Sequence, residues 1–300
     1  MQHKSMFRLV FERFLEHRLA LASLGVVIIF VLLAIGADSI AHILHLDPDS
    51  QDILSRYSSW SHAHWLGSDE AGRDVFIRLI YGARVSLFVA FISAIAAVVI
   101  GIAVGSVAGY FGGWIESMLM RITDAFLTLP QLPLLIVLAA IDFCKLPLIG
   151  RMFGGEDSSI LKMVLIFLFF SWMTVSRLIH GAVVAIRHQE FVMAAQTMGM
   201  KSWEIILKEI VPNVVSPVIV AVTLRVGQTI LGEATLSFLG LGIQPPTPSW
   251  GNMMTNALEA MYYRPSLVVM PGLLILFIVV SFNFLGDGLQ DALDPKAIRR

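Results

Sequence analysis

Long apolar runs constrain this chain more than any other feature of its sequence. A transmembrane helix needs about 20 predominantly apolar residues, and Leu19–Ala37 supplies 19 residues without a charge. Five further runs of similar character follow: Val85–Tyr110, Ala125–Ile141, Met163–Ile179, Val214–Leu231 and Leu267–Leu285. Together these runs predict an all-α, polytopic membrane protein with six transmembrane helices.

The composition agrees with a membrane protein and excludes several other classes. Hydrophobic residues make up 57% of the 300 residues and charged residues 14%, whereas soluble globular proteins contain about 25% charged residues. A net charge of −1 gives no support for nucleic-acid binding. The single cysteine, Cys144, excludes an internal disulfide and a multi-cysteine metal cluster. We interpret it as a small packing residue and expect no metal site.

The distribution of Lys and Arg predicts the orientation. Four basic residues precede the first run without a clear cleavage site after it, which favours an uncleaved anchor over a signal peptide. With the N-terminus inside, twelve Lys and Arg lie on the inner side and eight on the outer side, in agreement with the positive-inside rule. We therefore expect a multi-pass inner (plasma) membrane protein with both termini in the cytoplasm. Its predicted parts are a cytoplasmic tail at 1–18, a first helix at 19–37, an outer loop at 38–84, a core domain at 85–285 with a cytoplasmic loop at 187–213, and a cytoplasmic tail at 286–300.

The cytoplasmic loop has the pattern of two short helices that face water. Apolar residues recur with the spacing of an amphipathic helix in two sets, Phe191, Ala194, Ala195 and Met198, and then Trp203, Ile206, Leu207 and Ile210. Between the sets, Gly199 falls where a helix C-terminus favours a positive φ, and Ser202 is suited to cap the second helix. Pro212 limits how far that helix continues. A helix–glycine–helix unit between two spans predicts a docking surface for a soluble partner.

Two charges lie deepest in apolar sequence, Arg225 and Glu233. Charge inside a membrane is costly, so such residues usually pair or line a functional path. Eight residues apart on a helix places them about 80° from a common face, so they need not pair with each other. Either could line a translocation path; alternatively, Glu233 lies close enough to the outer end to contact water.

A compact, charged stretch in the outer loop contains Gly67, Asp69, Gly72, Arg73 and Asp74. Its acidic residues could suggest a cation site, but the D-x-[DN]-x-[DN]-G spacing of a calcium loop is absent. We expect Asp69, Arg73 and Asp74 to hydrogen-bond one another and to cap the helix that enters the second span.

Small residues and prolines predict how the spans pack. Gly101, Gly105 and Gly109 form a small-xxx-small ridge that lets a neighbouring backbone approach closely. Packing within the chain is favoured over a subunit contact. Pro130 and Pro133 are expected to kink the third span.

No motif supports catalysis by this chain, because Walker A, H-E-x-x-H and G-x-S-x-G patterns are all absent. An intramembrane enzyme would need a Ser/His pair, paired aspartates or metal ligands inside the spans. A secondary transporter or channel is the remaining alternative. It would need ionisable residues near mid-membrane, ideally in the paired broken helices of an inverted repeat, and the sequence shows no convincing repeat.

The cytoplasmic loop resembles the EAA loop of permease subunits of binding-protein-dependent ABC importers. In that loop an acidic residue and two alanines precede a glycine and an Ile-x-Pro ending. Five positions match in place: Ala194, Ala195, Gly199, Ile210 and Pro212. The position directly before the alanines is Met193 rather than an acid, and Glu190 stands three residues earlier.

Three further stretches narrow the resemblance. Leu66–Asp74, continuing through Tyr81–Leu87, is similar to the LGTDxxGRD…YGARxSL signature of peptide-class permeases. The loop before the last span and the C-terminus are also similar to that class, at Phe238–Gly242, Gln244–Gly251 and Phe282–Pro295. The chain therefore resembles the C-type permease of an oligopeptide, dipeptide or nickel importer along nearly its whole length.

The resemblance implies a core of five helices (spans two to six) with one peripheral N-terminal helix. It also implies partners: a homologous second permease, two cytoplasmic ATPases, and a periplasmic or lipid-anchored solute-binding protein, all at a lipid membrane. The EAA loop would insert into one ATPase as a coupling helix. ATP and magnesium would be used by the ATPases, so this chain itself would bind no cofactor and catalyse nothing. Di- or oligopeptides are the expected cargo, with nickel or another small solute as the alternative.

Overall fold

The computed structural model describes residues 6–61, 64–141, 143, 158–255 and 257–293. Cys144 and most of the predicted outer loop Asp142–Lys162 lie outside these residues. Within the described ranges the chain is built of helices and joining loops, without a β-strand. The all-α class expected from the apolar runs is confirmed.

Among the residues that the structure describes, five helices are long and apolar enough to cross a membrane: α2 (Arg18–Ile35), α4 (Val75–Phe111), α7 (Ser158–Ile186), α11 (Val215–Phe238) and α13 (Ser266–Leu293). Shorter helices flank or join them: α1 (Met6–Glu16), α3 (Ala37–Leu44), α5 (Gly113–Leu127), α6 (Gln131–Ala140) and α12 (Ala257–Tyr263). The loops contain 3-10 turns at η1 (Ile53–Ser55) and η5 (Asn252–Met254).

The third predicted span is a bent pair of helices rather than one helix over Ala125–Ile141. Helices α5 and α6 meet at an angle of 84°. Pro130 precedes α6 with an extended backbone. Proline has no N–H to donate and disfavours a helical residue before it, so the helix breaks at this point. Six crossings are present if the bent pair counts as one.

The second span is much longer than predicted, because α4 begins at Val75 rather than Val85. Asp74 caps its first turn by accepting a hydrogen bond from the N–H of Ile77 at 3.1 Å. The charges that suggested a loop are neutralised in the structure; Arg84, for example, pairs with Asp38 at 2.9 Å. The resulting helix of 37 residues is about 55 Å long.

The glycine ridge of α4 packs against α7, as predicted for packing within the chain. A methyl group on Gly101 would lie 2.6 Å from the Cβ of Val175, and one on Gly105 would lie 2.6 Å from the carbonyl oxygen of Ser176. Both distances are shorter than van der Waals contact. The ridge therefore explains why the two backbones can lie so close together.

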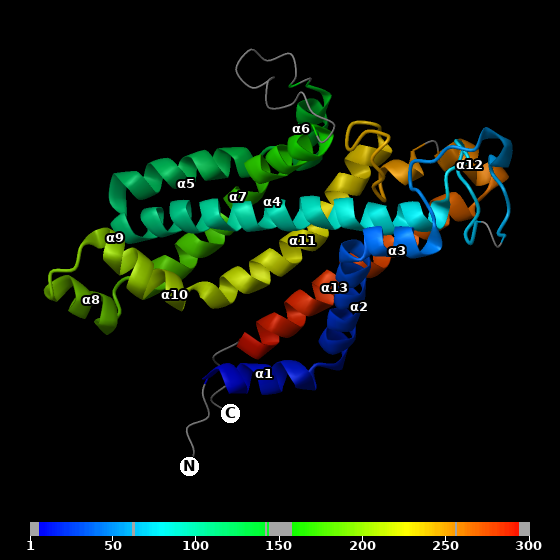
Figure 1. Ribbon diagram of the computed structural model, residues 1–300. Coiled ribbons are helices and arrows are strands. Elements are labelled where there is room, and N and C mark those ends of the chain that lie inside the picture. Colours follow the sequence, from blue (N-terminus) through cyan, green and yellow to red (C-terminus); the bar gives the residue numbers. More distant parts are fainter. Residues whose placement is uncertain (1–5, 62–63, 142, 144–157, 256, 294–300) are drawn as a thin grey trace.

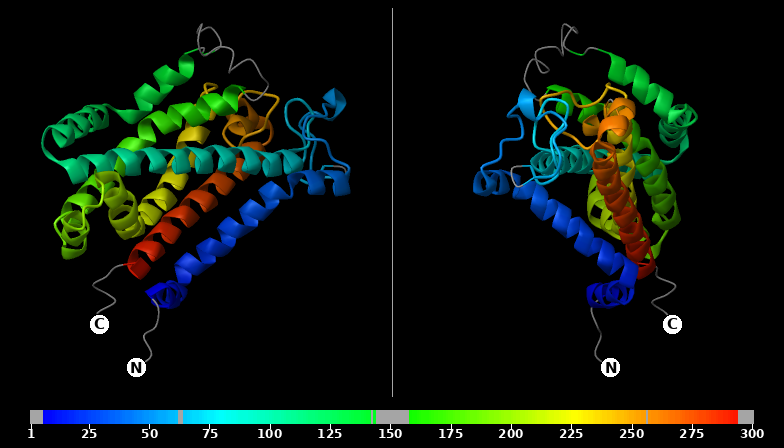
Figure 2. Two further views of the ribbon diagram at one scale, coloured as in Figure 1. Left: turned by 60° about the vertical axis from the view of Figure 1, so that its left-hand side comes forward. Right: turned by 90° about the vertical axis from the view of Figure 1, so that its right-hand side faces the viewer.

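The remaining spans complete one bundle (Figures 1 and 2), in which α13 lies between α2 and α11. Its core surrounds the fully buried Trp250, whose indole N–H donates to the carbonyl of Leu79 at 3.0 Å. Helix α1 and the end of α13 lie toward the same end of the bundle as the loop between α7 and α11 (Figure 1). The loops before α4 and α12 lie at the opposite end.

Both predicted tails are partly helical, so their boundaries are corrected. The N-terminal tail contains α1, which packs against α2 and α13 through the buried Phe14, Ala20 and Ala292. The last span continues to Leu293 rather than ending at Leu285. For this last span the apolar run predicted too early an end, because the helix continues beyond its apolar part through polar residues such as Asp287 and Asp291.

Candidate functional site

The loop that joins α7 to α11 folds into two short helices around Gly199. The first helix is α8 (Glu190–Thr197), and the second runs from α9 (Ser202–Ile205) through a π turn (η4, Ile206–Ile210) into α10 (Val211–Asn213). Gly199 has a φ of +77°, which confirms the predicted left-handed conformation. The turn closes where the N–H of Met200 donates to the carbonyl of Ala195 at 3.2 Å.

The start of the second helix differs from the prediction. Lys201 occupies the cap position and Ser202 is the first helical residue, so the prediction of a serine cap was wrong. The carboxylate of Glu204 accepts the N–H of Lys201 at 3.3 Å, which fixes the start one residue earlier. The effect predicted for Pro212 is confirmed, since α10 ends at the next residue.

The two predicted apolar stripes are divided between the protein interior and solvent. The buried members of the loop are Val192, Ala195, Ile205, Ile206 and Ile210, with Phe191 partly buried. The exposed members are Met193, Ala194, Met198, Trp203 and Leu207. The prediction that each stripe forms one face was wrong, because the short helices bury adjacent positions such as Val192 that lie outside the stripe. We call Met193, Met198, Trp203 and Leu207 the exposed apolar surface of the loop.

Polar contacts at the same end of the bundle attach this loop to the spans. Arg187, directly after α7, donates to the carbonyl of Gly109 at the end of α4 at 2.9 Å. Gln196 of α8 donates to the hydroxyl of Tyr110 at 3.4 Å. The loop is therefore tied to the glycine ridge, so a movement of the loop would act directly on the α4–α7 pair.

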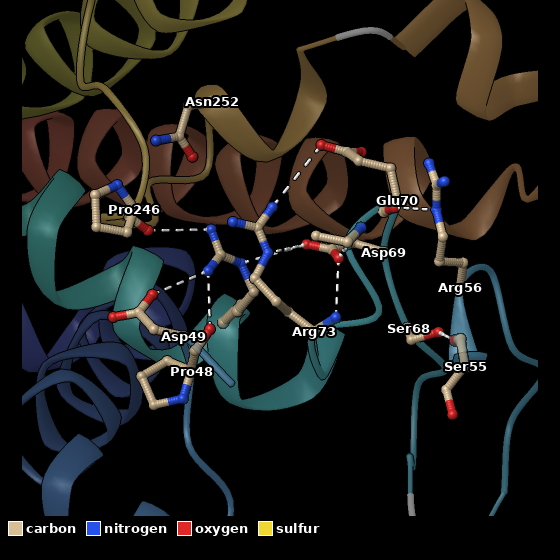
Figure 3. Close-up of polar contacts among 12 residues, drawn as sticks. Pro48, Asp49, Ser55, Arg56, Ser68, Asp69, Glu70, Arg73, Pro246 and Asn252 are labelled. Atoms are coloured by element: carbon tan, nitrogen blue, oxygen red, sulfur yellow. Dashed lines mark hydrogen bonds and ion pairs between the residues drawn. The ribbon is translucent and has the colours of Figure 1, made fainter. Parts of the chain in front are cut away.

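At the other end of the bundle, the outer signature loop forms a local network (Figure 3). One oxygen of Asp69 accepts from the N–H of Ala71 at 2.9 Å and of Arg73 at 3.0 Å, and the other accepts from the Arg73 guanidinium at 2.7 Å. Asp74 caps α4 as described above. The predicted bonding between Asp69 and Arg73 and the cap by Asp74 are thus confirmed. The other carboxylate oxygen of Asp74 lies 3.0 Å from Nδ1 of His64 rather than bonding Asp69 or Arg73.

Arg78, which the sequence analysis did not single out, links this network to two other loops. It is almost fully buried and donates to the carbonyl of Pro48 at 2.8 Å and of Pro246 at 3.4 Å. It also lies 3.6 Å from Asp69. Gly67 and Gly72 have φ of +81° and +76°, and a side chain on Gly72 would overlap the carbonyl of Asp52. These contacts require the loops to pack closely around the charged groups.

Glu233 is enclosed between α4, α11 and the following loop. It is 0% exposed, which contradicts the alternative that it contacts water. Its carboxylate accepts from the hydroxyls of Ser86 at 2.8 Å and Ser237 at 2.7 Å, and Ser237 in turn accepts from the N–H of Ile243 at 3.0 Å. Glu233 therefore holds α4, α11 and the loop after α11 together, and it lines neither of the hollows beside α11 described next.

Arg225 lies elsewhere on α11 and does not meet Glu233. Its side chain donates to the hydroxyl of Thr174 on α7. Two hollows, of about 350 Å³ and about 490 Å³, share Arg225 and Gln228 in their walls. Gln228 was missed by the sequence analysis, although its position three residues after Arg225 places it on the same helix face.

Comparisons with known proteins agree along the chain. The family described as "Binding-protein-dependent transport system inner membrane component" matches residues 101–299. A second family, "N-terminal TM domain of oligopeptide transport permease C", matches residues 5–58. The division between a peripheral N-terminal helix and a permease core therefore has a counterpart in two separate families.

Similar curated proteins cover almost the whole chain. A dipeptide transport system permease protein DppC of Alkalihalophilus pseudofirmus is 37% identical over 97% of this chain and 90% of its own length. The oligopeptide transport system permease protein OppC of Bacillus subtilis is 35% identical over 95% of this chain and 88% of its own. A glutathione transport system permease protein GsiD of Pectobacterium atrosepticum is 35% identical over 97% and 91%.

The fold also has a solved counterpart. A chain of the MetNI methionine ABC transporter, in an inward-facing conformation, aligns with a TM-score of 0.54 at 16% identity, covering 72% of this chain and 96% of that chain. At this identity the likeness concerns the fold alone. The family matches, the relatives and the fold together confirm the resemblance seen in the sequence: this chain belongs to the family of binding-protein-dependent transport system inner membrane components, as a multi-pass permease subunit of an ABC importer.

Proposed function

We propose that this chain forms half of the translocation pathway of an ATP-driven importer of di- or oligopeptides. The peptide cargo is supported by the names of the chain's relatives, which agree with one another. Those named for dipeptide, oligopeptide and glutathione transport match this chain over 95% or more of its length, and all three names refer to short peptides. Peptide cargo is therefore favoured over nickel.

The loop around Gly199 is proposed to couple the permease to a cytoplasmic ATPase. Exposed apolar side chains on short helices are typical of a protein–protein contact rather than of a solvated surface. The exposed apolar surface of the loop has this character, with Met198 74% exposed. The loop also contacts the end of α4 through Gln196 and Arg187. ATP-driven closure of the ATPases would then move α4 and α7 as rigid elements.

The proposed complex contains this chain, a homologous second permease, two ATPases that use ATP and magnesium, and an external solute-binding protein. This chain would bind no cofactor and catalyse no reaction. Both termini and the Gly199 loop would face the cytoplasm. The position of α1, the end of α13 and the Gly199 loop at one end of the bundle (Figure 2) supports this orientation, as does the excess of Lys and Arg predicted there.

Reconstitution of the complex in proteoliposomes tests this function. We expect uptake of a labelled dipeptide that requires both ATP and the binding protein, and no ATP hydrolysis by this chain alone. Nickel offered under the same conditions serves as the comparison cargo. Uptake driven by an ion gradient without ATP would contradict the proposal and favour a secondary transporter.

A further inference from the structure

Arg225 is a buried cation in the middle of a membrane span. It lies ten residues after the start of α11 and thirteen before its end, which places it about 15 Å and about 20 Å from the two ends of the helix. Its side chain is only 9% exposed. A charge at this depth is expensive unless a partner compensates for it.

The protein itself supplies little compensation. A guanidinium carries five N–H donors, and among the residues that the structure describes its one hydrogen-bond partner is the neutral hydroxyl of Thr174. Arg177 on α7, by contrast, has a carboxylate partner, since it lies 3.1 Å from Asp124. Arg225 is therefore left with free donors and an uncompensated positive charge.

The hollows on each side of Arg225 extend in opposite directions along α11. The first is lined by α11 from Arg225 to Leu236, toward the end that holds the outer loops. The second is lined by α11 from Pro217 to Gln228, toward α10 and the Gly199 loop. Arg225 and Gln228 stand where the two meet, so a molecule moving from one hollow to the other would pass the guanidinium.

The chemistry of the walls defines what would fit. Arg225 is the one charged residue among those described in either wall, and the other polar groups are neutral: Gln131, Ser171, Gln228, Thr229 and Thr235 in the first hollow, and Thr174, Gln228 and Gln290 in the second. The remaining walls are mainly apolar. Volumes of about 350 Å³ and about 490 Å³ fall within the range of small-molecule pockets. This combination suits a ligand with one negative charge, amide groups and apolar side chains.

We propose that Arg225 binds the C-terminal carboxylate of the peptide as it crosses the membrane. Every linear peptide with a free C-terminus presents this carboxylate whatever its side chains, and a guanidinium matches a carboxylate with two parallel N–H···O bonds. The glutamines beside it can bond both N–H and C=O groups of the peptide. This inference rests on the proposed peptide function. An acidic residue of the second permease could also pair with the Arg225 guanidinium, and the experiment distinguishes this subunit contact from peptide binding.

The test uses the full complex in proteoliposomes with its binding protein saturated either by a labelled dipeptide or by the same dipeptide as its C-terminal amide. The measured quantity is the ratio of the two ATP-dependent uptake rates. Because the binding protein is the same in every variant, a change in this ratio reports the permease. A charged hydrogen bond contributes about 1.5–3 kcal/mol, so we expect Arg225→Gln to lower the ratio by about tenfold or more, by slowing the free acid and not the amide.

Two further variants sharpen the result. Arg225→Lys keeps the positive charge but cannot form the bidentate hydrogen bonds of a guanidinium with a carboxylate, so we expect an intermediate ratio. Arg177→Gln removes an arginine of α7 that already has a carboxylate partner, and should leave the ratio unchanged. Co-purification of the second permease shows whether each variant assembles.

Three outcomes would overturn the inference: an unchanged ratio in Arg225→Gln, an equal loss of both uptake rates, or loss of the second permease from the complex. The last two would assign Arg225 to a subunit contact. If the wild-type complex instead showed no ATP-dependent peptide uptake at all, the proposed function would fail before Arg225 is tested.

Discussion

Replacement of Gly199 by valine tests how the coupling loop is built. No atom lies within 4 Å of a methyl group added at this position, so the effect comes from the backbone alone. A side chain at a φ of +77° costs about 1–2 kcal/mol, with a β-branched residue at the upper end. This is small compared with the stability of the bundle, so Gly199→Val should insert and assemble normally. The same cost is large for the equilibrium between the observed conformation of the loop and its alternatives. It would shift that equilibrium by about 5–30-fold away from the observed conformation.

The assay is ATP-dependent dipeptide uptake at equal amounts of permease in the membrane. We expect uptake to fall by a similar factor in Gly199→Val. Gly199→Asn is the matched rescue, since asparagine tolerates this conformation, and it should retain most of the uptake. Gly181→Val is the control for added volume, because Gly181 also has open space around it but lies within α7 without a positive φ. Normal uptake by Gly199→Val, or equal losses with valine and asparagine, would refute the reasoning.

Further predictions concern stability. Gly105→Leu should lower the melting temperature of the purified complex because α7 leaves no room for a side chain, whereas Gly25→Leu, which has open space around it, should change it little. Glu233→Leu should destabilise the complex by about 1–3 kcal/mol for each hydroxyl left without an acceptor, and more than Glu233→Gln, which keeps an acceptor; equal melting temperatures would contradict this. A hydrogen bond from Tyr81, together with Arg84, lowers the pKa of the Asp38 carboxyl group. The stabilisation that the Asp38 carboxylate provides should therefore be present at neutral pH and be lost as the pH falls through that lowered pKa. Thermal melting of Asp38→Asn should accordingly differ from wild type at pH 7 and converge with it in acid.

The sequence predicted features that depend on single residues with a strong local preference. Gly199 takes a positive φ, and Asp74 caps α4. The packing of the glycine ridge against another helix of the same chain was also predictable, because small residues at this spacing let a neighbouring backbone approach closely. In each case the preference of the residues themselves decides the local structure, and no tertiary contact opposes it.

Features that depend on tertiary contacts were predicted poorly. The start of α4 was predicted too late because a charged residue such as Arg78 suggests an exposed loop. In the structure Arg78 is buried and donates to the carbonyls of Pro48 and Pro246, which are distant in sequence. The burial of Val192 in place of Ala194 follows from how α8 rests on the spans, which periodicity in eight residues cannot specify. The enclosure of Glu233 likewise depends on a serine of α4 far away in the chain.

The most direct test of the central claim is photo-crosslinking from the coupling loop in the assembled complex. A photoreactive amino acid in place of Met198, which is 74% exposed, should form an adduct with the ATPase. The same group in place of Leu54, which is 98% exposed and lies in η1 of the loop before α4, should not. An ATPase adduct from position 198 and none from position 54 is the predicted result. An adduct between position 198 and the external binding protein, or between position 54 and the ATPase, would contradict both the coupling role and the orientation.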